Sequence, residues 1–174
     1  GRAGGSEELG GLRGVKHYLQ RSAVQGSPDM LTAVTGTWIK GAAELTAASH
    51  PFTRDFYQLQ IGETIHTAGR EVSLEDIEHF AEFTGDRFYA HMDAEAAKAN
   101  PFFPDRVAHG YLLLSFAAGL FVEPNPGPVL ANTGLNTLSF QQPVVVGDCI
   151  KVQLTVKRKT RRTEEYGEVR WAVV

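Results

Sequence analysis

The stretch YLLLSFAAGLFV, residues 111–122, is apolar on nearly all of its faces. A helix of this kind is stable in water only when neighbouring elements bury most of its surface. The run is too short to cross a bilayer, which requires about 20 apolar residues. It therefore predicts a helix buried at the centre of a domain.

Strands and short helices are predicted on both sides of this run. Strand-like alternation of apolar residues marks 56–62, 63–69, 130–144, 148–159 and 166–174. The patterns SLEDIEHFAEFTG (73–85) and DAEAAKAN (93–100) predict two short helices before it. An antiparallel sheet wrapped around one buried helix accommodates all of these elements, so we expect an α+β fold.

The two short helices carry clear start and stop signals. Ser73 is a predicted N-cap that completes a capping box with Asp76, and Asp93 is the predicted N-cap of the second helix. Gly85 is expected to end the first helix. The expected apolar stripe of the first helix consists of Leu74, Ile77, Phe80 and Ala81.

The composition is that of an ordinary globular protein. Of the 174 residues, 43% are hydrophobic and 21% charged, with a net charge of −3, which predicts neither nucleic acid nor membrane as a partner. Cys149 is the single cysteine, so no internal disulfide can form; we expect it to pack within a strand and the protein to be cytoplasmic.

We expect three parts along the chain. Residues 1–28 are Gly-rich and then helix-like over 12–24, a helix that has no partner of its own. Residues 29–51 are predicted to be a linker around Trp38, and residues 52–174 a compact domain. From the missing Met at the start we expect a fragment or a processed chain, and from the ending EVRWAVV, inside a predicted strand, we expect a truncated C-terminus.

The sequence FTGDRFYAH, residues 83–91, holds the first candidate chemistry. Asp86 and His91 lie on the connection between the two short helices, where side chains can converge on one water molecule as general acid and base. Phe88 and Tyr89 lie between them and are expected to keep the site dry. Alternatively, Asp86 only stabilises a turn and His91 is a surface residue.

The sequence VAHGYLLLS, residues 107–115, holds the second candidate. Gly110 lies where the central helix starts, so a ligand can approach its backbone and free amides there can polarise a carbonyl oxygen. Alternatively, Gly110 relieves crowding in a tight turn. His109 is either a core histidine bonded to the backbone or a residue with a direct catalytic role. The candidate substrate-binding residues are Phe88, Tyr89, His109 and Tyr111.

Other features point to no further chemistry. The six histidines are scattered without metal-ligand spacing, so we predict no metal site and no cofactor. The basic run VKRKTRR, residues 156–162, is read as a solvated hairpin, with phosphate binding as the alternative.

The segment FTGDRFYAHMDAEAA (83–97), followed by VAHGYLLLS, resembles the MaoC-like (R)-specific enoyl-CoA hydratase family. The resemblance implies a hot-dog fold over residues 52–174 and an acyl-CoA thioester as substrate. It also implies that Asp86 and His91 activate water and that the Gly110 amide binds the thioester oxygen. A homodimer or larger homo-oligomer is expected.

One departure from the family motif refines the resemblance. Phe88-Tyr89 replaces the usual Asn-Pro, and together with NPFFPDRVAHGYL (100–112) and FVEPNPGPVLAN (121–132) it resembles the hydratase domain of bifunctional, PaaZ-type ring-opening enzymes of phenylacetate catabolism. This implies hydration and ring opening of oxepin-CoA. It also implies that residues 1–28 end a fused aldehyde dehydrogenase domain, whose activity is not expected here.

Three other functions remain open at this point. The chain could be an (R)-specific hydratase of linear enoyl-CoA, a hot-dog acyl-CoA thioesterase, or a module that binds acyl-CoA without turnover. Release of free CoA distinguishes the thioesterase, and binding without turnover distinguishes the module.

Overall fold

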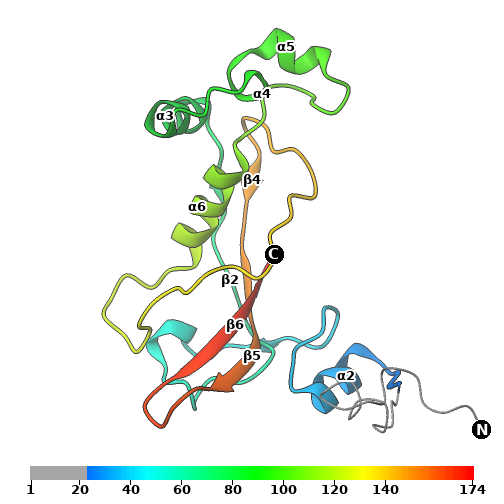
Figure 1. Cartoon of the computed structure of the whole chain (residues 1–174), viewed down its shortest axis with the longest axis vertical. Helices are drawn as coiled ribbons and strands as arrows, with labels where there is room; N and C mark the ends of the chain where they lie inside the picture. Colours follow the sequence, from blue (N-terminus) through cyan, green and yellow to red (C-terminus); the bar gives the residue numbers. More distant parts are fainter. Residues whose placement is uncertain (1–22) are drawn as a thin grey trace, which may run out of the picture.

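The computed structural model describes residues 23–174, and Figure 1 shows an elongated molecule with three levels. Three short helices lie at one end: α3 (Leu74–Thr84), α4 (Tyr89–Met92) and α5 (Ala94–Ala99). Helix α6 (Gly110–Phe121) runs through the middle level, towards a sheet at the other end.

The predicted helix caps are confirmed. The capping box between Ser73 and Asp76 is complete, because the Ser73 hydroxyl accepts from the Asp76 amide and the Asp76 carboxylate accepts from the Ser73 amide, both at 3.0 Å. Gly85 ends α3 in the left-handed conformation, with φ of 80°. Asp93 accepts hydrogen bonds from two amides of the first turn of α5. Local signals therefore fix both helices that flank the candidate site.

The sheet has four strands in the order β1-β2-β5-β6. Its antiparallel part consists of β2 (Glu63–His66), β5 (Gln153–Arg161) and β6 (Gly167–Val173), and β1 (Leu45–Thr46) adds a parallel edge. A separate pair, β3 (Arg70–Glu71) and β4 (Cys149–Ile150), lies beside α6 (Figure 1). Three of the five predicted strand segments, 63–69, 148–159 and 166–174, therefore contain strands of the structure.

The prediction of a strand over 56–62 is wrong. After the short 3-10 helix Pro51–Thr53, this segment forms successive turns, in which Gln58 donates to the Asp55 carbonyl at 2.9 Å and Glu63 to the Gln60 carbonyl at 3.1 Å. These local bonds satisfy amides that a strand would have paired across a sheet. The buried ion pair of Arg54 with Glu63, at 2.8 Å, holds the turns against β2.

The prediction of a strand over 130–144 is also wrong for the single chain. This segment is irregular, and the isolated bridge between Val107 and Val145 is formed just beyond its end. Its apolar side chains remain exposed: Leu130, Leu135, Leu138 and Phe140. Strand pairing requires a neighbouring backbone edge, and among the described residues this segment meets one at its end only, where the Ala108 amide donates to the Val144 carbonyl at 2.7 Å.

Helix α6 is less buried than its sequence predicts. One residue, Leu112, is fully buried; it packs with Val72, Ile77 and Ala108, and partly buried Phe116 packs against the same cluster. Tyr111 is 66% exposed. The expectation of burial on most sides therefore fails for the single chain, because α3 and the segments around β3 and β4 cover one face only.

The segment predicted as a linker contains ordered structure. Helix α2 (Pro28–Thr35) begins after the N-cap Ser27, and Trp38 is 4% exposed, with its amide bonded to the Lys157 carbonyl at 2.7 Å. Part of residues 29–51 thus belongs to the packed sheet end. The helix predicted over 12–24 falls on residues outside the described range, except for its last two, which are not helical.

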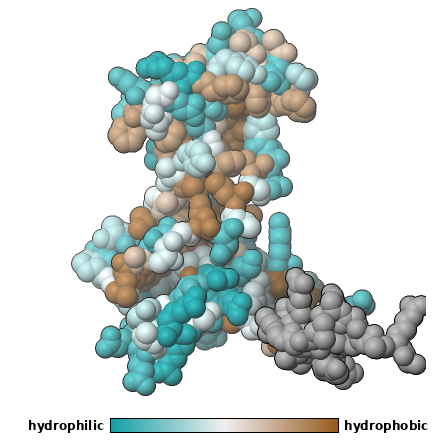
Figure 2. Space-filling view, viewed as in Figure 1, coloured by the Kyte–Doolittle hydropathy of each residue, from teal (hydrophilic) through white to brown (hydrophobic). Residues whose placement is uncertain are grey.

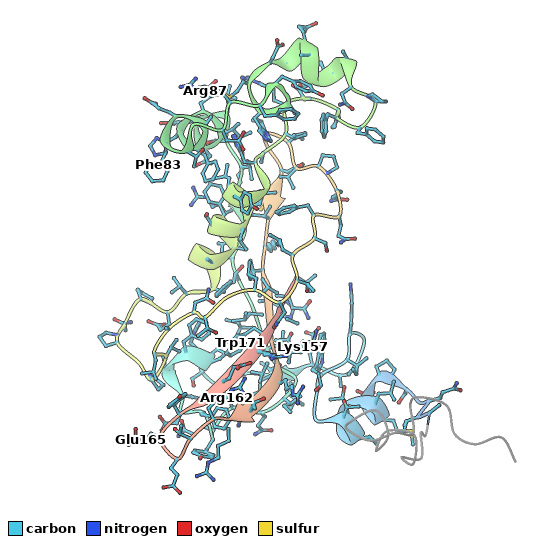
Figure 3. All side chains as sticks on the ribbon, viewed as in Figure 1. Phe83, Arg87, Lys157, Arg162, Glu165 and Trp171 are labelled. Atoms are coloured by element: carbon cyan, nitrogen blue, oxygen red, sulfur yellow. The ribbon has the colours of Figure 1, made fainter. Side chains whose placement is uncertain are left out.

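The basic run forms a hairpin, as predicted. Residues 162–166 join β5 to β6, and Figure 3 shows Arg162 and Glu165 at its tip. Cys149 is exposed rather than packed, so that prediction is wrong: successive side chains of a strand point to opposite faces, and in β4 it is Ile150 that packs against the core cluster. Among the described helices, none is long and apolar enough to cross a membrane.

Candidate active site

The three polar residues at the junction of α3, α4 and α6 come together. Asp86 follows the left-handed Gly85, His91 lies in α4, and His109 is the N-cap residue of α6. Each residue contributes one side-chain atom, a ring nitrogen or a carboxylate oxygen, and these three atoms lie within 4.8 Å of one another. The structure therefore brings Asp86 and His91 close enough to hold one small molecule between them.

The ring of His91 is fixed by the backbone. Its Nδ1 atom lies 2.7 Å from the carbonyl oxygen of Val107, and a carbonyl can only accept, so Nδ1 carries the proton. In the neutral imidazole the other nitrogen, Nε2, then has a free lone pair. His91 is thereby held in the tautomer that can accept a proton from water.

His109 lies beneath this pair. It is 1% exposed, its Nε2 atom lies 2.9 Å from the Asp86 carbonyl oxygen, and its ring stacks on that of His91 with 3.8 Å between centroids. Burial lowers the pKa of His109, although the hydrogen bond to the Asp86 backbone opposes the shift. The neutral ring supports both residues of the pair, so His109 is a core histidine bonded to backbone that also positions the site.

The Asp86 carboxylate lies in an Asx-type turn. Its Oδ1 accepts from the Phe88 amide at 3.4 Å, and the Asp86 amide donates to the Thr84 hydroxyl at 3.3 Å. The side chain is exposed. The turn-forming role considered from the sequence is thus present, and it leaves the second carboxylate oxygen free beside His91.

The start of α6 offers unpaired amides. The first hydrogen bond of this helix is the one that the Leu113 amide donates to the His109 carbonyl, at 3.1 Å. The amides of residues 110–112 precede it, and no side chain caps them in the described part of the chain. An oxygen with partial negative charge is favoured there by the helix dipole as well as by these donors.

The aromatic residues do not close the site. Phe88 is 53% exposed, and Tyr89, half-exposed, accepts a 2.8 Å hydrogen bond from the Asn100 amide group. Phe88 packs edge-on against His91, with 6.0 Å between ring centroids. The expectation that these rings keep the site dry is therefore wrong for the single chain, which leaves Asp86 and one side of Tyr111 in solvent.

Three ligand-type residues within 4.8 Å also raise the question of a metal ion. The rings of His91 and His109 are stacked, with 29° between their planes and 3.8 Å between their centroids. One nitrogen of each ring is already bonded to a carbonyl oxygen. The histidine spacing in the sequence therefore did not reveal this cluster, in which each ring keeps one nitrogen without a backbone bond.

Sequence reasoning missed three supports of the site. The Val107 carbonyl sets the His91 tautomer, Thr84 bonds the Asp86 amide, and Asn100 orients Tyr89. A backbone carbonyl leaves no signal in a sequence, because every residue has one. Asn100 follows α5 and Tyr89 begins α4, so their hydrogen bond depends on how these two helices lie in space, which the sequence does not give.

Comparison with known proteins gives a consistent picture. The MaoC like domain family matches residues 57–173. Protein MaoC of Klebsiella aerogenes is 53% identical over 160 residues, which cover 92% of this chain and 48% of that protein. A 3-hydroxybutyryl-CoA dehydratase of Methylorubrum extorquens is 36% identical over 101 residues, 58% of this chain and 62% of the relative. The chain thus spans about half to three-fifths of the length of these relatives.

Solved structures show the same relationship. The monoamine oxidase regulatory protein of Archaeoglobus fulgius has a TM-score of 0.64 and 33% identity, covering 70% of this chain and 84% of its own. An (R)-hydratase of A. caviae, involved in PHA biosynthesis, has a TM-score of 0.51 and 25% identity, covering 67% and 85%. The predicted α+β hot-dog fold is confirmed. Since the family match extends over more than half of the residues, the chain belongs to the MaoC-like domain family.

Proposed function

We propose that this chain adds water to the double bond of an unsaturated acyl-CoA thioester. The observation that carries the proposal is the convergence of Asp86 with His91, whose Nε2 has a free lone pair, next to the open N-terminus of α6. The relatives described as dehydratases support the same chemistry, because dehydration is the reverse of hydration.

Three groups carry the proposed reaction: the Gly110 amide, Asp86 and His91. The thioester oxygen accepts a hydrogen bond from the Gly110 amide, which draws electrons from the conjugated double bond. Asp86 and His91 hold the water, and one of them removes its proton while the hydroxyl group bonds to the β-carbon. A proton returned to the α-carbon completes the addition, so one water is consumed and no cofactor is needed.

For the substrate we propose oxepin-CoA, whose seven-membered ring opens after hydration because the resulting hemiacetal collapses. The support is the Phe88-Tyr89 pair beside His91, together with the resemblance to ring-opening hydratases. The second candidate is a linear enoyl-CoA, which the 3-hydroxybutyryl-CoA dehydratase relative favours. Incubation with oxepin-CoA and with crotonyl-CoA, followed by mass spectrometry, decides: a gain of one water identifies the substrate.

The catalytic pair is tested by Asp86→Asn and His91→Gln. We expect each variant to lose about 100-fold or more in kcat, equivalent to about 2.7 kcal/mol of barrier, as for the loss of an acid–base group. Glu82→Gln and His79→Gln are matched controls, since both residues are exposed on α3. Activity of Asp86→Asn or His91→Gln within a few-fold of the parent would remove the assignment.

A thioesterase is distinguished by free CoA thiol. The exposed thiol of Cys149 also reacts with thiol reagents, so the assay is run with Cys149→Ser. Hydration leaves the thiol signal at zero while the absorbance of the conjugated thioester falls. Turnover-dependent thiol release would support the thioesterase, and binding without either change would support a non-catalytic module.

We also propose that a second copy of the chain covers α6 and residues 123–148. Both carry apolar side chains that the single chain leaves in water, among them Leu130, which is 82% exposed. Contiguous exposed apolar surface of this kind marks an interface. The open site around Phe88 would then be closed by the partner.

A further inference from the structure

A single aromatic ring lies over the start of α6. A methyl group added to Gly110 would meet two carbon atoms of the Phe140 ring, Cε2 and Cζ, at 2.5 Å, and Cδ2 at 3.0 Å. Carbon atoms in ordinary contact are about 3.5–4.0 Å apart. The ring therefore lies against the face of Gly110 where any other residue would carry its side chain.

The position of Phe140 relative to the backbone places it in the candidate site. An oxygen bonded to the Gly110 amide lies about 2.9 Å from the nitrogen, and the nitrogen about 1.5 Å from Cα. A thioester oxygen at this amide is thus a close neighbour of the ring. The acyl carbons that follow the carbonyl must pass along the ring or be stopped by it.

The segment that carries Phe140 is anchored on one side only. The Ala108 amide donates to the Val144 carbonyl at 2.7 Å, next to the bridge of Val107 with Val145. Residues 123–143 before this anchor form no helix or strand. Phe140 itself is 53% exposed in the single chain, so part of the ring is uncovered where a second copy would close the site, and an acyl group held there can contact it.

We propose that Phe140 determines which acyl groups this site accepts, an inference that rests on the proposed hydratase function. The ring forms a flat wall beside the thioester, against which a planar conjugated acyl group can lie. Short or cyclic unsaturated acyl groups fit along this wall. A long flexible tail is excluded, because the ring occupies the space next to Gly110 through which it would extend.

The test compares two substrates that differ only in acyl length. In Phe140→Ala we expect the ratio of kcat/KM for trans-2-octenoyl-CoA over crotonyl-CoA to rise about tenfold or more, as expected when a pocket wall is removed. Phe83→Ala is the matched control: it removes the same ring from α3, where Phe83 is 81% exposed and points away from the molecule (Figure 3).

The outcomes separate the inference from the function on which it rests. If the parent hydrates crotonyl-CoA but the ratio stays within threefold in Phe140→Ala, the inference is wrong and the hydratase function stands. If both substrates change by the same factor, the ring contacts the CoA arm they share, which also overturns it. If the parent hydrates no enoyl-CoA, the proposed function fails and the inference fails with it.

A second measurement tests the contact without using activity. Gly110→Ala should lower the melting temperature, because its methyl group meets the ring at 2.5 Å. In the double variant with Phe140→Ala this loss should be smaller than the sum of the two single changes. Additive changes would show that the ring does not lie on Gly110 in solution, and would overturn the proposal.

Discussion

The ring of His109 contains a buried nitrogen without a hydrogen-bond partner among the described residues, which is uncommon in a folded protein. This atom is Nδ1, while Nε2 is bonded to the Asp86 carbonyl. An unpaired buried polar atom costs about 1–3 kcal/mol. Such a cost is retained when the residue does something that an apolar side chain cannot, and here it holds the Asp86 backbone and supports the His91 ring.

The first residue-scale prediction concerns His109→Leu, which removes both the hydrogen bond to Asp86 and the stacked ring. We expect kcat to fall about tenfold or more with little change in KM, because the pair loses its geometry while the substrate contacts remain. His109→Gln retains a donor and should recover part of the loss. Equal activity of His109→Leu and the parent would show that the ring has no positioning role.

The same residue predicts a pH dependence of stability. Because burial lowers the folded-state pKa of His109 below its ordinary 6.5, the unfolded chain takes up a proton first as the pH falls through that value. Stability is then lost below about pH 6.5, and the loss ends once the folded protein also takes up the proton. When the pH is lowered from about 7.5 to about 5, the melting temperature of His109→Gln should fall by less than that of the parent. His79 is exposed on α3, so the melting temperature of His79→Gln should fall by as much as that of the parent.

At the scale of the elements, α3 matters because its C-terminal end places Asp86. The helix is held at its start by the box of Ser73 and Asp76, to which Arg70 adds a 3.0 Å ion pair. Although burial raises the pKa of Asp76, the hydrogen bonds from Ser73 and Arg70 outweigh it and the pKa is lowered. The cap is thus both a local signal in the sequence and an energetic support of the site.

Ser73→Ala tests this support. We expect the free energy of unfolding to fall by about 1 kcal/mol, the usual cost of losing an N-cap, with kcat nearly unchanged because Gly85 still ends the helix before Asp86. Urea denaturation measures the first quantity and the hydration assay the second. Ser49→Ala, at an exposed loop residue, is the control and should leave both unchanged. A large loss of kcat would mean that the cap, rather than Gly85, positions the carboxylate.

The elements also show what could be predicted from the sequence. Capping residues predict α3 and α5, and alternating apolar residues predict β2, β5 and β6. In each case the deciding interactions are local or repeat along one segment. The strands expected over 56–62 and 130–144 fail for a physical reason: alternation says that a segment can pair, not that an edge is available. The supports of the site, such as the Val107 carbonyl, depend on tertiary contacts and were not predictable.

At the scale of the whole molecule, the disagreement over α6 and residues 130–144 has one explanation. The sequence of α6 predicts burial on most sides, and 130–144 predicts a paired strand, yet the single chain provides neither. Both predictions describe the same surface, since Phe140 lies against Gly110 at the start of α6. A second copy that lies over this surface would bury the helix and give the segment a partner, which is what the apolar pattern requires.

We therefore expect the purified chain to be a dimer by analytical ultracentrifugation, and Leu135→Glu to dissociate it. Leu135 is 58% exposed in the single chain, and a buried unpaired charge at an interface is costly enough to prevent assembly. Met30→Glu is the control, because this equally exposed residue lies on α2, at the far end from α3 and α5 (Figure 1), and it should leave the dimer intact. Figure 2 shows apolar surface in the middle of the molecule, and a monomeric parent would leave this surface in water. If dissociation also removes activity while Asp86 and His91 are unchanged, the partner closes the site; if a monomeric variant remains fully active, the site is complete within one chain.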